Sequence, residues 1–114
     1  MSELQGIARF RFYEGKVEEY KRLAAQALEI VRTQDTGTLL YDTYFNEDQS
    51  HAVVLERFRD SQALIEHSEH LADLMEPILA TGDVAGELLG DLSPELRAKM
   101  EGAPVGLFTL YQSM

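Results

Sequence analysis

The densest group of side chains able to move protons lies in the middle of the chain, at residues 66–70, Glu-His-Ser-Glu-His. Histidine titrates near neutral pH, so it can act as a general base or bind a ligand oxygen. His67 follows Ala63 and Leu64 at the spacing of an apolar helix face, which predicts that it points toward the sheet. Two interpretations stand for His67: a catalytic base, or a buried histidine bonded to a backbone carbonyl.

His70 lies three residues after His67, so on a continuous helix the two histidines share a face. A zinc ion would need a third and usually a fourth ligand from elsewhere in the chain. The sequence has no cysteine and no HExxH motif, so we expect no metal site. The ordinary alternative, a surface histidine among glutamates, applies to at least one of the two. No glycine-rich nucleotide or flavin fingerprint occurs either, so we expect no cofactor.

A second candidate is Glu56, which alternates with apolar residues along the segment 52–58. An apolar setting raises the pKa of a carboxyl group unless a cation pairs with it. Arg9 or Arg11, on a neighbouring predicted strand, is expected to supply that cation. A structural ion pair and a catalytic carboxyl are therefore both open for Glu56.

Phenols occur at Tyr13, Tyr41, Tyr44 and Tyr111. Tyrosine is common in strands, and it also lines pockets for aromatic ligands because it joins an apolar ring to a polar tip. Tyr41 is our candidate for such a wall.

The elements that must position these residues belong to one domain over residues 1–114. The chain carries 10 basic and 20 acidic side chains, a net charge of −10, which argues against nucleic acid and anionic membranes as partners. We expect no membrane span, because no apolar run approaches the ~20 residues that a bilayer requires. A chain without cysteine fits the cytoplasm, where we place it.

Hydrophobic periodicity predicts strands over residues 6–13, 38–45, 52–59, 84–92 and 104–111. It predicts helices over residues 16–34 and 93–101, and a third from Ser61 until Pro77 disturbs it. An earlier break near His70 would instead make two short helices. Gly37 is expected to stop the first helix in a left-handed conformation.

The resulting order is β-α-β-β-α-β followed by an added helix and strand, which is the ferredoxin-like arrangement of an α+β fold with a four-stranded antiparallel sheet. Ile7, Leu39 and the Val-Val-Leu run at residues 53–55 place apolar side chains on both faces of that sheet. Helices cover only one face, so we expect a homodimer in which two sheets pack together and the C-terminal strand reaches across.

Two segments carry a family resemblance. The first strand runs into Glu-Gly-Lys-Val-Glu-Glu-Tyr at residues 14–20, and Glu56-Arg57-Phe58 is followed by a predicted helix with His67 nine residues after Phe58. This pattern resembles the antibiotic biosynthesis monooxygenase family of the dimeric α+β barrel superfamily, over about residues 6–92. The family usually has tryptophan where this chain has Phe58.

The resemblance implies a homodimeric α+β barrel with one pocket per subunit between sheet and helices. It further implies a cofactor-independent monooxygenase of small aromatic, phenol or quinol substrates, or a dimeric protein that binds a small molecule without turnover. On the enzyme interpretation His67 and Glu56 are the catalytic candidates. Phe58, Tyr41 and His70 are the candidate substrate contacts.

Overall fold

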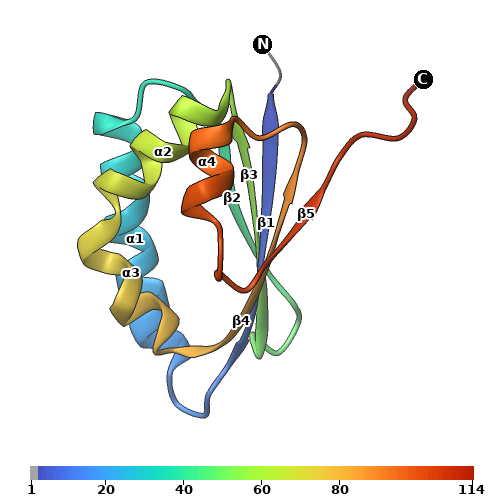
Figure 1. The fold of residues 1–114 in the computed structure, drawn as a ribbon. Coiled ribbons are helices and arrows are strands. Elements are labelled where there is room, and N and C mark those ends of the chain that lie inside the picture. Colours follow the sequence, from blue (N-terminus) through green and yellow to red (C-terminus); the bar gives the residue numbers. More distant parts are fainter. Residues whose placement is uncertain (1–2) are drawn as a thin grey trace.

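Residues 3–114 are described by a computed structural model, in which a single sheet carries its helices on one face (Figure 1). The elements in chain order are β1 (Leu4–Phe12), α1 (Val17–Gln34), β2 (Thr38–Phe45), β3 (His51–Phe58), α2 (Ser61–His70), α3 (Ala72–Leu79), β4 (Gly82–Leu89), α4 (Pro94–Lys99) and β5 (Val105–Phe108).

The strands follow the order β2-β3-β1-β4-β5 across the sheet. The first four are antiparallel to their neighbours, and β5 pairs parallel to β4. The predicted ferredoxin-like α+β fold with an added helix and strand is therefore confirmed, and the sheet is open. Ser93 caps α4 as expected, because its Oγ accepts a hydrogen bond from the Leu96 amide at 3.2 Å.

The second helical region divides at Leu71, which lies between α2 and α3. The earlier break near His70 is thus correct, and the prediction that Pro77 marks the disturbance is wrong, because Pro77 lies inside α3. His67 and His70 both fall on α2, three residues apart on one helix.

The end of α1 also differs from expectation. Gly37 does not have a positive φ, so the left-handed stop predicted there is wrong. Its lack of a side chain serves close packing instead, because a Cβ at Gly37 would lie 2.5 Å from the Cβ of Ala63 on α2. Glycine therefore lets the α1–β2 connection pass directly against α2.

Alternate residues of the strands face the helices and form two apolar clusters. One gathers around Phe10, Tyr20 and Val54, and the other around Leu4, Phe58 and Leu88. Glu56 lies between Val54 and Phe58 on the same face of β3, so it occupies the seam between the two clusters. That seam is where the candidate polar residues meet.

The other face of the sheet carries no helix in the described part of the chain (Figure 1). Ile7 and Leu55 are cross-strand partners on this face and are partly exposed. Beyond β5 the chain extends away from the body, and the Tyr111 side chain near its end is 94% exposed. Among residues 3–114, no helix has the length and apolar character needed to cross a membrane.

Candidate active site

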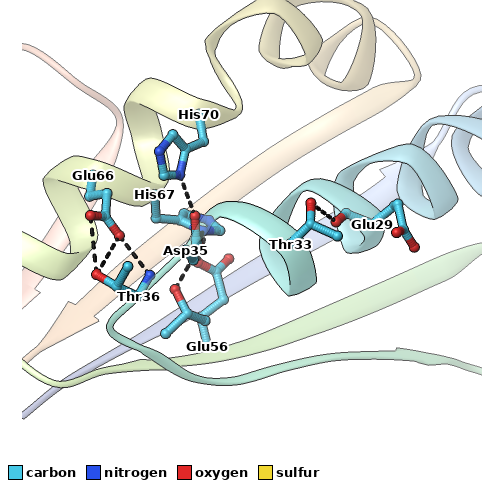
Figure 2. A network of polar contacts seen from close by, with 9 residues as sticks. Glu29, Thr33, Asp35, Thr36, Glu56, Glu66, His67 and His70 are labelled. Atoms are coloured by element: carbon cyan, nitrogen blue, oxygen red, sulfur yellow. Dashed lines mark hydrogen bonds and ion pairs between the residues drawn. The ribbon is translucent and has the colours of Figure 1, made fainter.

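Asp35, the residue that ends α1, is the centre of the polar network (Figure 2). Its carboxylate side chain is only 1% exposed and accepts hydrogen bonds from Nδ1 of His67 at 2.7 Å, Nδ1 of His70 at 2.6 Å and Oγ1 of Thr38 at 2.7 Å. Burial alone would raise the pKa of Asp35, but the bonds from His70, Thr38 and His67 outweigh it and hold that pKa below its ordinary value.

The His67 ring is buried between two aromatic side chains. Its side chain is 6% exposed, and its ring lies 5.0 Å from the Phe58 ring and 5.4 Å from the Tyr41 ring. An ionised Asp35 can only accept a hydrogen bond, so Nδ1 of His67 carries a proton and Nε2 is the nitrogen that faces Glu56. The prediction that His67 points toward the sheet is confirmed, and its partner is a carboxylate rather than a backbone carbonyl.

Glu56 lies next to this nitrogen, with Oε1 3.6 Å from Nε2 of His67. Burial raises the pKa of Glu56 above its ordinary value, and the nearby Asp35 carboxylate raises that pKa further. His67 lowers the pKa, but the net shift is upward. Two lone pairs at this separation repel, and a proton on either group removes that repulsion. Glu56 and His67 are therefore placed to share one proton.

The arginines expected to pair with Glu56 do not reach it. Arg9 and Arg11 lie on the uncovered face of β1, where Arg9 pairs with Glu87 at 3.4 Å and Arg11 with Asp83. The expectation of an arginine partner was wrong because Glu56 belongs to the helix-facing side. Without that cation, burial dominates the Glu56 pKa.

A β-bulge brings Tyr41 to the same side. The register of β2 against β3 shifts between Thr38 and Leu40, and Tyr41 then pairs with Glu56. The extra residue changes which side chains of β2 face the helices. Burial raises the pKa of the Tyr41 phenol, and the nearby carboxyl groups of Glu56 and Asp35 raise it further, so Tyr41 stays protonated at neutral pH.

His70 lies at the more open side of the network, with its side chain 26% exposed. Asp35, Glu66 and His70 each offer a ligand atom within 4.8 Å of the others. Each of these groups already has a hydrogen-bond partner within the protein, however. His70 bonds Asp35, and Glu66 accepts hydrogen bonds from the amide and the hydroxyl of Thr36. The cluster needs no ion to explain it, and the absence of a metal site stays a prediction.

Two hollows border this region. A shallow cavity of about 120 Å³, open to solvent, lies beside Glu56 at β1 and β4, and its lining includes Gly6, Ala8, Leu64, Gly86, Met100 and Val105. An open groove of about 570 Å³ lies between α1 and β2, with Tyr20, Leu28 and Tyr41 in its walls. Glu56 thus faces the cavity, whereas Tyr41 lines the groove.

The predicted site residues are thus neighbours, although they are not equally accessible. Phe58 is fully buried and contacts His67, and His70 contacts Asp35. Sequence reasoning missed Asp35, because an aspartate after a helix is usual in turns. A usable signal was present: two histidines three residues apart on one helix face require a partner, and Asp35 follows the preceding helix.

Comparison with known proteins gives one family. Residues 6–74 match the family model described as antibiotic biosynthesis monooxygenase. The matched segment begins where the resemblance predicted and ends before β4. No curated protein matches the chain.

Solved structures share the fold over most of the chain. MupZ from Pseudomonas fluorescens has a TM-score of 0.87 at 21% identity, covering 100% of this chain and 94% of that one. Rv0793 from Mycobacterium tuberculosis has a TM-score of 0.71 at 26% identity, covering 81% and 97%. SnoaB, a cofactor-independent oxygenase from Streptomyces nogalater, was solved as a point mutant and has a TM-score of 0.70 at 14% identity, covering 82% and 96%.

Proposed function

The chain belongs to the antibiotic biosynthesis monooxygenase family, and from that premise we propose that it is a cofactor-independent monooxygenase of a small phenol or quinol. The observation that carries the proposal is the Glu56–His67 pair, with Oε1 and Nε2 3.6 Å apart and His67 anchored by Asp35. This pair can take a proton from a substrate hydroxyl and keep it inside the protein.

Glu56 is the group of the pair that a substrate can touch. Nδ1 of His67 is bound to Asp35 and its Nε2 faces Glu56, while the Glu56 carboxyl borders the cavity. Glu56 is thus the catalytic residue of the proposal, and His67 is a positioning residue that shares its proton. This order differs from the one expected from the sequence, in which His67 was the base and Glu56 its support.

Proton removal is the step that starts the oxidation. Loss of the hydroxyl proton turns a phenol into an electron-rich anion, which can transfer electrons to dioxygen. The oxygen molecule adds at a ring carbon, the carbon-bound hydrogen leaves as a proton, and the O–O bond breaks. One oxygen atom stays on the ring as a quinone carbonyl and the other leaves as water. A phenol plus dioxygen therefore balances as a quinone plus water, with the four electrons supplied by the substrate.

We also propose that the functional unit is a homodimer that forms an α+β barrel. The support is the uncovered sheet face with its apolar Ile7 and Leu55, together with the exposed apolar side chains of the C-terminal segment at Phe108, Leu110 and Tyr111. Apolar surface of this kind is commonly covered by a partner. A cytoplasmic location stays a prediction.

A second candidate is a dimeric protein that binds a small molecule without turnover. The observation that favours it is Phe58, which stands where the family pattern usually has tryptophan and is fully buried. The same pocket would then serve for recognition only.

Oxygen uptake separates the two candidates. Wild-type protein and His67→Ala are supplied with a panel of hydroquinones and naphthols, and dioxygen consumption is followed with an electrode. We expect wild-type uptake above the uncatalysed rate with at least one compound, and a loss of about a hundredfold in His67→Ala. Equal, near-zero rates for both proteins across the panel would rule out the oxygenase and leave the binding protein.

A further inference from the structure

Residues 109–114, the C-terminal arm, leave the sheet on the side away from the helices (Figure 1). The Leu110 side chain is 74% exposed and that of Tyr111 is 94% exposed. Residues 103–114 carry no charged side chain, in a chain whose residues are 26% charged. The arm also lies beyond residues 6–74, which match the family model. An uncharged segment with its large apolar side chains in solvent is typical of a surface that another surface covers.

The open groove of about 570 Å³ between α1 and β2 has the chemistry to cover such a segment. Tyr20 and Tyr41 give it aromatic walls, and the small Ala25 side chain on α1 leaves it open. Lys21 and Asp42 also border the groove, and their opposite charges compensate each other. An uncharged, largely apolar segment can therefore enter without leaving a buried charge unpaired.

The groove runs beside a free strand edge. Among the described strands, β2 pairs with β3 alone, because it is the first strand of the sheet. The backbone amide and carbonyl groups along its other edge can accept a further strand. Extended segments bind such an edge through main-chain hydrogen bonds, and pockets beside the edge take their alternate side chains. The edge of β2 and the groove together form an acceptor for one extended segment.

The arm and the groove of one chain lie at opposite edges of the sheet, because β2 is first and β5 last in the strand order. A two-fold axis parallel to the strands reverses this order in a second sheet packed on the uncovered face. The β5 edge of one copy then lies opposite the β2 edge of the other. Packed sheets are about 10 Å apart, and residues 109–114 can span about 20 Å when extended. The arm of one copy can therefore reach β2 of the other.

The alternation of β5 decides which side chain of the arm enters the groove. Leu107 pairs with Leu88 of β4, which is buried in the cluster that packs against α2. Alternate residues of a strand share a face, so Tyr111 has the phase of Leu107 and faces the helix layer. Leu110 has the opposite phase and faces the space between the two sheets. Beside β2 of a second copy, Tyr111 is thus directed toward that copy's α1.

We propose that the C-terminal arm of each copy adds to the free edge of β2 in the other copy and places Tyr111 in the groove between α1 and β2. Tyr41 lines this groove, and its ring lies 5.4 Å from the His67 ring. Tyr111 of one copy therefore closes the groove over the Tyr41 wall of the other copy's candidate site. Each site is then built from both chains. The inference rests on the proposed homodimer, and it adds the segment that crosses and the surface that it covers.

The order of the arm in solution provides the test. The full chain is labelled with ¹⁵N, and the backbone order parameters S² of Leu110 and Tyr111 are measured, with the mass taken from sedimentation equilibrium. A docked arm is expected to give S² of about 0.85, and an undocked arm less than about 0.6. We expect the docked value in wild type and in Tyr111→Phe, which keeps the ring. Tyr111→Asp is expected to give the undocked value.

Two adjacent variants of α1 locate the arm. Ala25 lines the groove, Gln26 does not, and both are exposed. Ala25→Glu puts a charge into the groove and is expected to release the arm, whereas the matched control Gln26→Glu is expected to leave it ordered. Both positions lie away from the uncovered sheet face, so both variants are expected to stay dimeric.

A variant that opposes association tests whether the arm crosses between copies. Leu55→Glu places a carboxylate on the uncovered face, opposite Ile7, and leaves the groove unchanged. As a monomer it is expected to show an undocked arm, because the groove of the same chain lies at the far edge of the sheet.

Each part of the inference can fail separately. A mobile arm in a dimeric wild type would refute the docking and leave the homodimer intact. Equal order in Ala25→Glu and Gln26→Glu would place the arm outside the groove, and an ordered arm in monomeric Leu55→Glu would assign it to its own chain. A monomeric wild type would remove the homodimer and the docking together. These measurements involve no oxygen uptake, so the proposed oxygenase activity is tested independently.

Discussion

Oδ2 of Asp35, the residue that ends α1, accepts a hydrogen bond from Nδ1 of His67 on α2 at 2.7 Å. This contact joins two helices and also determines which nitrogen of His67 faces Glu56. Because Nδ1 is occupied, Nε2 is left to share a proton with Glu56 on β3. The buried Asp35 carboxylate thus holds α1 against α2 and also orients His67 toward Glu56.

Asp35→Asn is expected to lower the free energy of unfolding by about 2–3 kcal/mol at neutral pH, because hydrogen bonds to a charged group are worth about 1.5–3 kcal/mol. The pKa of Asp35 is lowered in the folded state, so its contribution is present above the unfolded pKa of about 3.9 and is lost as pH falls through the folded value. The difference between wild type and variant should therefore shrink in acid. Urea unfolding at a series of pH values measures it.

Asp42→Asn is the matched control for this prediction. Asp42 is an exposed aspartate on β2, so its replacement is expected to change the unfolding free energy by less than about 0.5 kcal/mol. If Asp35→Asn were no more destabilising than Asp42→Asn, the network would not be holding the two helices together.

Much of the fold follows from local pattern. The alternation of Ala8, Phe10 and Phe12 with charged residues predicts β1 and its buried face, and Ser93 before Pro94 predicts the start of α4. These features depend on residues close together in the chain, so they can be predicted from the sequence alone. The spacing of His67 after Leu64 likewise placed it on the inner face of α2.

The partners of the site residues depend on contacts between distant segments. Asp35 meets His67 only because Gly37 allows the connection after α1 to pass against Ala63. Glu56 lacks an arginine because the register of β1 sends Arg9 and Arg11 to the other face. Register and helix-to-helix approach are set by the whole packed structure, and no short pattern in the sequence encodes them.

Glu56→Gln is expected to be more stable than wild type at neutral and higher pH. The pKa of Glu56 is raised in the folded state by burial, so the stability linked to its protonated form is complete below the unfolded pKa of about 4.3 and is lost as pH rises through the folded value. Glutamine does not titrate and avoids this loss. Unfolding free energies of the two proteins should be closest in acid and diverge as pH rises; a constant difference would contradict the raised pKa.

Leu55→Glu tests the proposed homodimer. Leu55 lies on the uncovered face of the sheet opposite Ile7, where a buried carboxylate would oppose association. Sedimentation equilibrium of wild type is expected to give about twice the 12.9 kDa of one chain, and the variant is expected to give the mass of one chain. Leu28→Glu, at a position on α1 that is 39% exposed, is the control and should stay dimeric. A monomeric wild type would refute the proposal.

The pH dependence of oxygen uptake tests which group takes the substrate proton. A base must be deprotonated to act, so kcat/KM with an active phenol is expected to rise with pH through the raised pKa of Glu56 and then level off. Glu56→Gln should lose about a hundredfold in rate and the rising limb with it. His67→Gln should keep a rising limb but shift its midpoint, because His67 acts through Glu56 across 3.6 Å. His51→Gln, at an exposed histidine of β3, should leave the profile as in wild type. A rising limb that persists unshifted in Glu56→Gln would assign the proton to another group.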